Sequence, residues 1–205
     1  MKEERDTVRL EAFSDGVFAI AITLLVLDVK VPDTKPNPGT LLQGLLVQWP
    51  EYLSYFTSFL VLGVIWINHH NTFKYISRSN NVLLMLNTIY LMFVAFIPYP
   101  TELLSEYILI EQDGALVSKI YSGTMAITAI IYGILWWYAS SNYRLIDSSV
   151  PISTIRKIDR MNYIGIFFYV LSFFLSFWNV YFSMAIYFVL TIYYAFPDWE
   201  GKHHK

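Results

Sequence analysis

Long uncharged apolar runs alternate with short polar segments along this 205-residue chain. A helix that crosses the hydrocarbon core of a bilayer needs about 20 predominantly apolar residues, so the length of each run is compared with that value. The runs predict six membrane-spanning helices, at about residues 8–31, 49–73, 79–101, 118–143, 156–177 and 180–197. We therefore predict an all-α, polytopic membrane protein in which residues 1–205 form a single six-helix domain.

Proline, glycine and charge mark the breaks between the runs. Residues 32–40 hold three prolines and a glycine, which predicts a loop. Pro98 and Pro100 stand at the end of the third run and predict that its helix stops there. The uncharged stretch 161–197 is too long for one crossing, so it predicts two helices joined by a tight turn near Trp178 and Asn179.

The first run differs from the others because it contains a carboxylate. Its strictly uncharged part, residues 16–27, is too short to span a bilayer alone. Either the first span ends early, or Ser14 and Asp15 lie within the inner half of the membrane. We favour the second interpretation, in which Asp15 needs a polar partner.

Composition and charge agree with a membrane location. Hydrophobic residues make up 56% of the chain and charged residues 15%, whereas a soluble domain carries about 25% charged residues. With six spans, all of the 14 Lys and Arg residues except Lys30, Lys35 and Lys119 fall on the side that holds both termini. Because Lys and Arg gather on the cytoplasmic side, we predict a multi-pass protein of the cell membrane with both termini in the cytoplasm.

Composition also excludes several kinds of function. The absence of cysteine excludes disulfides and thiolate metal sites. The net charge of -2 comes without a basic block, so no nucleic-acid partner is expected. The N-terminal apolar stretch contains Asp15 and lacks a small-residue cleavage site, so a cleaved signal peptide is not expected. No cofactor and no bound metal are expected either.

Polar and aromatic residues at the predicted cytoplasmic ends of the first two spans form one candidate group. They are Arg9, Phe13, Ser14 and Asp15 in the first span and Trp66, His69 and His70 in the second. Since the two sets lie at similar depth, we expect Asp15 to meet a histidine. An Asp in a first helical turn also favours the helix dipole, and adjacent histidines at a helix end are often interfacial, so a structural role stays open.

An apolar stripe along the first span forms a second candidate group. Ile20, Leu24 and Leu27 recur at i, i+4 and i+7 and share one face of the helix, with Thr23 beside them. Asp15 lies about 140° around the axis from Ile20. Because a stripe of Ile and Leu is usually a packing face, its periodicity alone assigns no function.

The first span also carries a recognisable motif. The string Arg9-x-x-x-Phe13-Ser14-Asp15, running into Ala19, Ile20 and Thr23, resembles the signature of the transmembrane protein 175 family, which comprises a lysosomal potassium channel and its prokaryotic relatives. The segment from Trp66 through His69 and His70 to Phe73 extends this likeness. The resemblance implies a potassium-permeable leak channel, and not an enzyme, whose pore is lined by the first span.

The resemblance also implies roles for individual residues. Rings of Ile20, Leu24 and Leu27 would close the pore, and Ile20 and Thr23 would take part in selectivity. Arg9, Phe13, Ser14 and Asp15 would hold helices together beneath the pore. The motif occurs once in this chain, as in bacterial members, whereas vertebrate members carry it twice. One span cannot enclose a pore, so the implied assembly is a homotetramer in contact with membrane lipid, which conducts potassium and other monovalent cations.

Two other classes remain open from the residues alone. His69, His70 and Asp15 could serve an intramembrane enzyme, although no HExxH motif and no cysteine supplies further metal ligands. Asp15 could also be the proton site of a coupled transporter, although no predicted span carries paired internal Gly or Pro breaks. We therefore prefer the channel interpretation.

Overall fold

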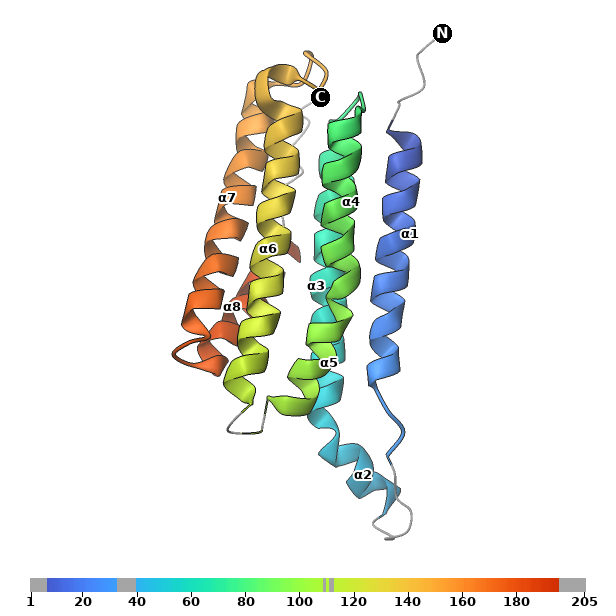
Figure 1. The fold of residues 1–205 in the computed structure, drawn as a ribbon, viewed down its shortest axis with the longest axis vertical. Coiled ribbons are helices and arrows are strands. Elements are labelled where there is room, and N and C mark those ends of the chain that lie inside the picture. The colour runs from blue at the N-terminus through green and yellow to red at the C-terminus, as the bar shows by residue number, and fades with distance from the viewer. Residues whose placement is uncertain (1–6, 33–39, 109, 111–112, 196–205) are drawn as a thin grey trace, which may run out of the picture.

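Helices make up nearly all of the regular structure. The computed structural model describes residues 7–32, 40–108, 110 and 113–195, and their long helices run side by side (Figure 1). The elements are α1 (Val8–Leu24), η1 (Leu25–Asp28), α2 (Leu41–Val47), α3 (Trp49–Phe73), α4 (Asn81–Phe96), α5 (Pro98–Tyr107), α6 (Gly114–Ser140), η2 (Ser141–Tyr143), α7 (Ile152–Leu175) and α8 (Val180–Ala195). The predicted all-α class is confirmed for these residues, whose β structure is limited to an isolated bridge between Ile76 and Ile146.

Five helical stretches within the described residues are long and apolar enough to cross a membrane. They are Val8–Asp28, Trp49–Phe73, Asn81–Tyr107, Gly114–Tyr143 and Ile152–Leu175. Helix α8 has 16 residues, fewer than the length of a full crossing. The predicted sixth span, 180–197, ends outside the described residues, so the count of six stays a prediction.

The helix of the third run ends at the prolines, as the sequence predicts, but a further helix that the sequence did not predict begins there. Helix α4 ends at Phe96, and α5 begins at Pro98 and continues to Tyr107. Proline is tolerated in the first turn of a helix, where its missing N–H would have no partner in any case. Ile97, at the joint, is fully buried. The prolines therefore start a second helix after a break.

The loop predicted over residues 32–40 and the turn predicted near Trp178 have different outcomes. Most of the loop, residues 33–39, lies outside the described residues. It is followed by the short helix α2, which the sequence did not predict and which begins with a capping box formed by Thr40 and Gln43. The tight turn is confirmed, because α7 ends at Leu175 and α8 begins at Val180.

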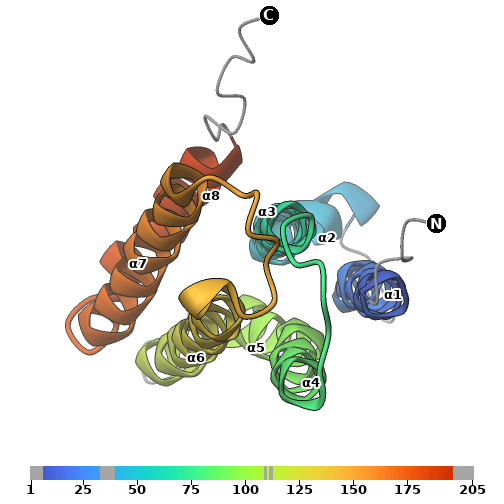
Figure 2. The same ribbon diagram turned by 90° about the horizontal axis from the view of Figure 1, so that it is seen from above.

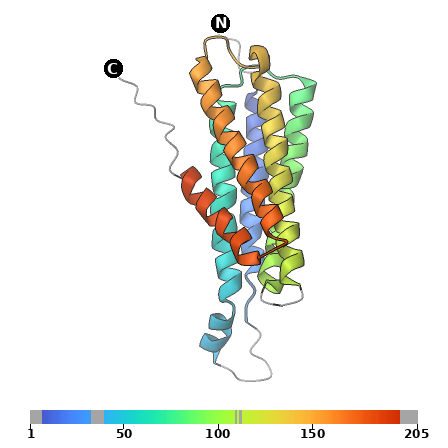
Figure 3. The same cartoon turned by 90° about the vertical axis from the view of Figure 1, so that its left-hand side faces the viewer.

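Helix α1 lies at one edge of the bundle and packs against α3 and α4, whereas α7 and α8 lie at the opposite edge (Figures 2 and 3). The face of α1 that points into the bundle is buried and comprises Leu10, Ser14, Phe18 and Ala21, continued by Leu25 in η1. These positions recur every three or four residues, as expected for one face of a helix. The remaining face of α1 is not covered by the described part of its own chain.

Candidate functional site

The apolar stripe of α1 lies on the face that points away from the bundle. Ile20, Leu24 and Leu27 are 62%, 42% and 69% exposed, whereas Phe18 on the inner face is 1% exposed. Helix α1 lies at the edge of the bundle in Figure 2, which agrees with the exposure of these three side chains. The stripe is therefore not a packing face within one copy, and in a membrane it must face lipid or other copies of the chain.

Thr23 lies on the same exposed side of α1. Its hydroxyl donates a hydrogen bond to the carbonyl oxygen of Ala19 at 2.8 Å and also lies 3.0 Å from the carbonyl oxygen of Ile20. A Ser or Thr hydroxyl in a membrane helix commonly donates its proton to a carbonyl oxygen of the preceding turn in this way. Because the proton is used internally, the hydroxyl oxygen keeps lone pairs that can accept from a donor or coordinate a ligand.

The outer end of the stripe departs from regular α-helix. Residues Leu25–Asp28 form the 3-10 helix η1, which turns by about 120° per residue rather than about 100°. Leu27 is thereby rotated relative to its position in a straight α-helix, yet it remains on the accessible side. Helical spacing therefore placed Ile20 and Leu24 directly, whereas the position of Leu27 depends on this tighter turn.

A buried chain of polar side chains joins α1 to α3 and α4. His69 Nε2 lies 3.0 Å from Asn87 Oδ1, and Asn87 Nδ2 donates to Ser14 Oγ at 2.9 Å. Ser14 Oγ in turn donates to the carbonyl oxygen of Leu10 at 2.8 Å. All three side chains are almost completely buried. We name His69, Asn87 and Ser14 the buried network.

Aromatic rings surround His69 and fix its orientation. Its ring stacks on Phe73 with centroids 4.1 Å apart and lies parallel to the ring of Tyr90 at 5.7 Å. Phe18 of α1 approaches at 5.5 Å in a tilted geometry. Since His69 is 1% exposed, its main roles in the structure are to pack and to hold Asn87.

The partner of Asp15 is a tryptophan and not the histidine expected from the sequence. Trp66 Nε1 donates to Asp15 Oδ1 at 2.8 Å, and the ring of His70 stacks on Trp66 with centroids 5.8 Å apart. Successive residues of a helix point about 100° apart. Ser14 and His69 therefore point inward into the buried network, whereas their neighbours Asp15 and His70 point toward the exposed rim of the α1–α3 contact.

Arg9 and Phe13 occupy the exposed side of α1 below the stripe. Phe13 is 57% exposed, and Arg9 is also exposed. Arg9 makes no hydrogen bond or ion pair with any of the described residues. The motif thus divides in two: Ser14 and Asp15 bind other helices of the same copy, while Arg9 and Phe13 point away from it.

Sequence reasoning missed two features of the site. Asn87 links the other members of the buried network. The sequence feature that could have identified it is its polar amide side chain within the uncharged run that forms α4. At the opposite end of the molecule, Lys30 Nζ pairs with Glu106 at 2.7 Å and with Glu102 at 3.5 Å. The hydrogen bond that Lys30 donates to Glu106 raises the pKa of Lys30 above its usual value, so this tie between the segment after η1 and α5 would be lost by Lys30 deprotonation only in strongly alkaline solution.

The described residues contain no group of three or more His, Asp or Glu side chains placed to hold a metal ion. Asp15, His69 and His70, which the enzyme interpretation requires to act together, do not bind one another: Asp15 and His70 both contact Trp66, whereas His69 pairs with Asn87. The site is therefore a structural network beside an exposed apolar helix face.

Comparison with known proteins places this geometry in a family. The family model for the endosomal/lysosomal potassium channel TMEM175 matches residues 9–98, a range that includes both faces of α1 and the whole buried network. The chain is 40% identical over 188 residues to a potassium channel of Streptomyces collinus, covering 92% of this chain and 91% of the relative. It is 41% identical over 194 residues to a potassium channel of Chamaesiphon minutus, covering 94% and 95% of the two chains.

The fold agrees with that of a solved relative. The crystal structure of a lysosomal potassium-selective channel TMEM175 homolog from Chamaesiphon minutus superposes with a TM-score of 0.83, at 38% sequence identity. The match covers 94% of this chain and 97% of the solved one. Sequence similarity over nearly the full length and the shared fold lead to one conclusion: this chain belongs to the TMEM175 family of ion channels.

Proposed function

We propose that this chain is the subunit of a potassium-permeable leak channel of the cell membrane, in which α1 helices from several copies line the pore. The observation that carries the proposal is the accessible stripe of Ile20, Leu24 and Leu27 on the edge helix of the bundle. The relatives that are similar over more than nine-tenths of the chain are named potassium channels, which supports potassium as the permeant ion.

Several copies are required because a single edge helix cannot surround a pore. We propose a homotetramer, the assembly that resemblance to single-repeat bacterial members implies. Placing α1 at the centre of four copies would bury the stripe against the pore axis and leave α7 and α8 at the lipid-facing periphery (Figure 2). We propose that α8 completes a sixth crossing, which gives the even number that the Lys and Arg distribution favours for two cytoplasmic termini.

The stripe would act as a hydrophobic constriction. Rings of Ile and Leu side chains form a narrow apolar neck, and such a neck stops conduction when it loses its water. Ions cross only when the neck widens enough to remain wet. Ile20 would set the narrowest point, and the oxygen of Thr23, one turn further along, would contribute to the preference for potassium.

The remaining motif residues would act as supports. Within one copy, Ser14, Asp15, Trp66, His69 and His70 hold α1 against α3 and α4 through the hydrogen bonds and stacked rings described above. Arg9 and Phe13 point away from their own copy, so we propose that they contact the neighbouring copy beneath the pore.

The enzyme interpretation is set aside, because the family consists of ion channels. The transporter interpretation is weakened by the helices themselves. Transporters of the repeat type place broken helices in paired positions. Among the described residues, α4 and α5 are separated by a break at Ile97, whereas the long helices α3, α6 and α7 are each continuous.

Ion flux from liposomes tests the proposed function. Purified protein is reconstituted with an internal potassium gradient, and the flux is measured with sodium and then a large organic cation as the exchanging ion. We expect the current to follow the potassium gradient and to fall when sodium replaces potassium. Absence of cation flux through well-folded oligomers would contradict the channel proposal, and saturable solute counterflow would favour a transporter.

Replacing Asp15 with alanine is expected to impair assembly more than permeation. The change removes the acceptor of the Trp66 hydrogen bond, which is 2.8 Å long. A hydrogen bond to a charged group contributes about 1.5–3 kcal/mol, and less at an exposed position such as Asp15. Asp15→Asn is the matched control, because its amide keeps an oxygen acceptor for Trp66. Size-exclusion chromatography with light scattering measures the tetramer fraction, and flux is then normalised per tetramer.

The two variants are expected to differ in how much tetramer they form. Asp15→Ala should lose most of the tetramer, with normal flux through what remains, whereas Asp15→Asn should assemble like the native chain. A fully assembled Asp15→Ala protein with altered gating would instead place Asp15 in the conduction machinery.

A further inference from the structure

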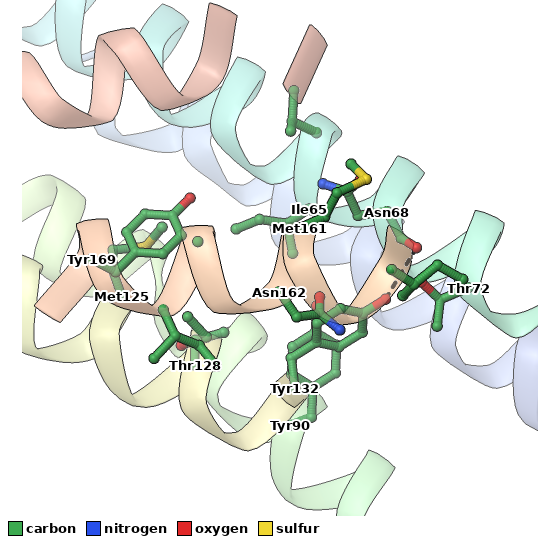
Figure 4. Close-up of a pocket in the computed structure, with 15 residues that line it drawn as sticks. Ile65, Asn68, Thr72, Tyr90, Met125, Thr128, Tyr132, Met161, Asn162 and Tyr169 are labelled. Atoms are coloured by element: carbon green, nitrogen blue, oxygen red, sulfur yellow. Dashed lines mark hydrogen bonds between the residues drawn. The ribbon is translucent and has the colours of Figure 1, made fainter. Parts of the chain in front are cut away.

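A cavity lies inside the bundle, away from the exposed face of α1. Its volume is about 70 Å³, and Figure 4 shows side chains from α3, α4, α6 and α7 converging on it. Asn68 and Tyr90 come from α3 and α4, while Tyr132 and Asn162 come from α6 and α7. Four helices of one copy form the walls of the cavity, so it exists without any contribution from a neighbouring copy.

Two polar atoms of the cavity-lining residues have unmet hydrogen-bonding capacity. Asn68 Oδ1, an acceptor, and Asn162 Nδ2, a donor, are both buried without a hydrogen-bond partner among the described residues. A buried polar atom that lacks a partner is unfavourable. A hydroxyl group can donate to the first atom and accept from the second, whereas a purely apolar molecule satisfies neither.

The rest of the wall and the size of the cavity restrict the ligand further. Ile65, Met125 and Ile166 supply an apolar surface beside the two amides. A water molecule needs about 10–15 Å³ by a comparable measure, so the space holds a few waters or one short-chain alcohol. Drug-sized ligands occupy pockets of about 300–1,000 Å³ and are too large.

The cavity shares a wall with the residues that hold α1. Tyr90 lines the cavity, and its ring lies parallel to His69 with centroids 5.7 Å apart. Tyr132 also lines it and donates a hydrogen bond to the carbonyl oxygen of Asn68 at 3.0 Å. His69 then connects through Asn87 to Ser14 on α1. A molecule that shifts the Tyr90 ring therefore acts on the buried network.

We propose that this cavity binds a small amphiphile that carries one hydroxyl group, in the size range of a short-chain alcohol, and that its occupancy is transmitted to α1 through Tyr90 and the buried network. Water fills the site when the amphiphile is absent. The binding step stands on the cavity alone, whereas the effect on conduction rests on the proposed channel function.

Photolabelling tests the binding step. A diazirine derivative of butan-1-ol is irradiated with the reconstituted native protein, and labelled peptides are identified by mass spectrometry. We expect label on cavity residues such as Tyr132 and Asn162, displaced by excess butan-1-ol. Label confined to lipid-facing residues such as Met92, or label that excess butan-1-ol does not displace, would overturn the proposal.

Three variants test whether the displaceable label depends on the cavity. Asn162→Leu keeps the side-chain size but removes the donor, and should weaken binding roughly three- to tenfold, the effect of one hydrogen bond. Ala129→Phe fills the cavity and should abolish the displaceable label. Ala95→Phe makes the same change at an exposed position of α4 and should label like the native chain. The competition on native protein decides the proposal even when a variant fails to fold.

Flux measurements test the transmission step. Butan-1-ol should change potassium flux through the native channel, with a smaller change in Asn162→Leu and an unaltered change in Ala95→Phe. Displaceable labelling with no effect on flux would overturn transmission and leave the binding site established. Absence of any potassium flux from the native protein would instead contradict the channel function, a result that the labelling experiment does not depend on.

Discussion

Replacing Ile20 with asparagine is expected to raise potassium flux and to weaken the preference for potassium over sodium. Ile20 is 62% exposed on the face of α1 that we place at the pore. An amide at the constriction binds water. The constriction therefore stays hydrated at a diameter at which a purely apolar constriction would lose its water. A barrier lowered by only about 1.4 kcal/mol raises the rate about tenfold, and flux from proteoliposomes measures that increase.

The control for this prediction is the same substitution on a remote helix. Ile127 lies on α6 and is 45% exposed, and in Figure 2 α4 lies between α6 and α1. Ile127→Asn should leave both flux and selectivity near native values. Equal effects of the two substitutions would show a general disturbance of the membrane domain, and an unchanged Ile20→Asn channel would remove Ile20 from the constriction.

Replacing Asn87 with leucine is expected to destabilise the protein strongly. Asn87 is fully buried and bonds both His69 and Ser14, so leucine leaves the histidine ring without its partner and releases α1 from α4. Each buried polar group that loses its partner costs about 1–3 kcal/mol. We expect a fall of several degrees in the thermal unfolding midpoint of the detergent-solubilised protein, followed by size-exclusion fluorescence.

Asn81 provides the matched control for this substitution. It is the first residue of the same helix and is exposed, so Asn81→Leu changes the chemistry identically without touching the buried network. Its unfolding midpoint should stay close to the native value. Equal midpoints for Asn81→Leu and Asn87→Leu would show that the buried network contributes little to stability.

Local signals in the sequence were sufficient to predict the long helices and to assign residues to the two faces of α1. Run length predicted the five long apolar helical stretches, because the thickness of the membrane core imposes a minimum length on a spanning helix. Helical periodicity placed Ile20 and Leu24 on one side of α1 and Asp15 well away from them, because side-chain direction along a helix follows from its pitch alone. Proline was a partial guide, since it marked the end of α4 but gave no sign that Pro98 also starts α5.

The identity of partners needed the tertiary structure. Similar depth correctly brought the first and second spans together, but depth does not specify rotation about the helix axis. Rotation directs Asp15 to Trp66 and Ser14 to Asn87, and it places Leu10, Ser14 and Phe18 on the buried face of α1. The motif was therefore sufficient to recognise the family but not to predict which residues its side chains contact.

Within this protein, sequence alone determined what depends on distance along the chain: the all-α class, the apolar runs, the division of α1 into two faces and the family motif. Tertiary structure alone decided what depends on several helices at once. It placed Asn87 at the centre of the buried network, paired Lys30 with Glu106 far along the chain, and formed a cavity lined by Asn68 and Asn162. The physical reason is that helix formation and membrane insertion are governed by local and additive energies, whereas side-chain pairing depends on how helices rotate and pack against one another.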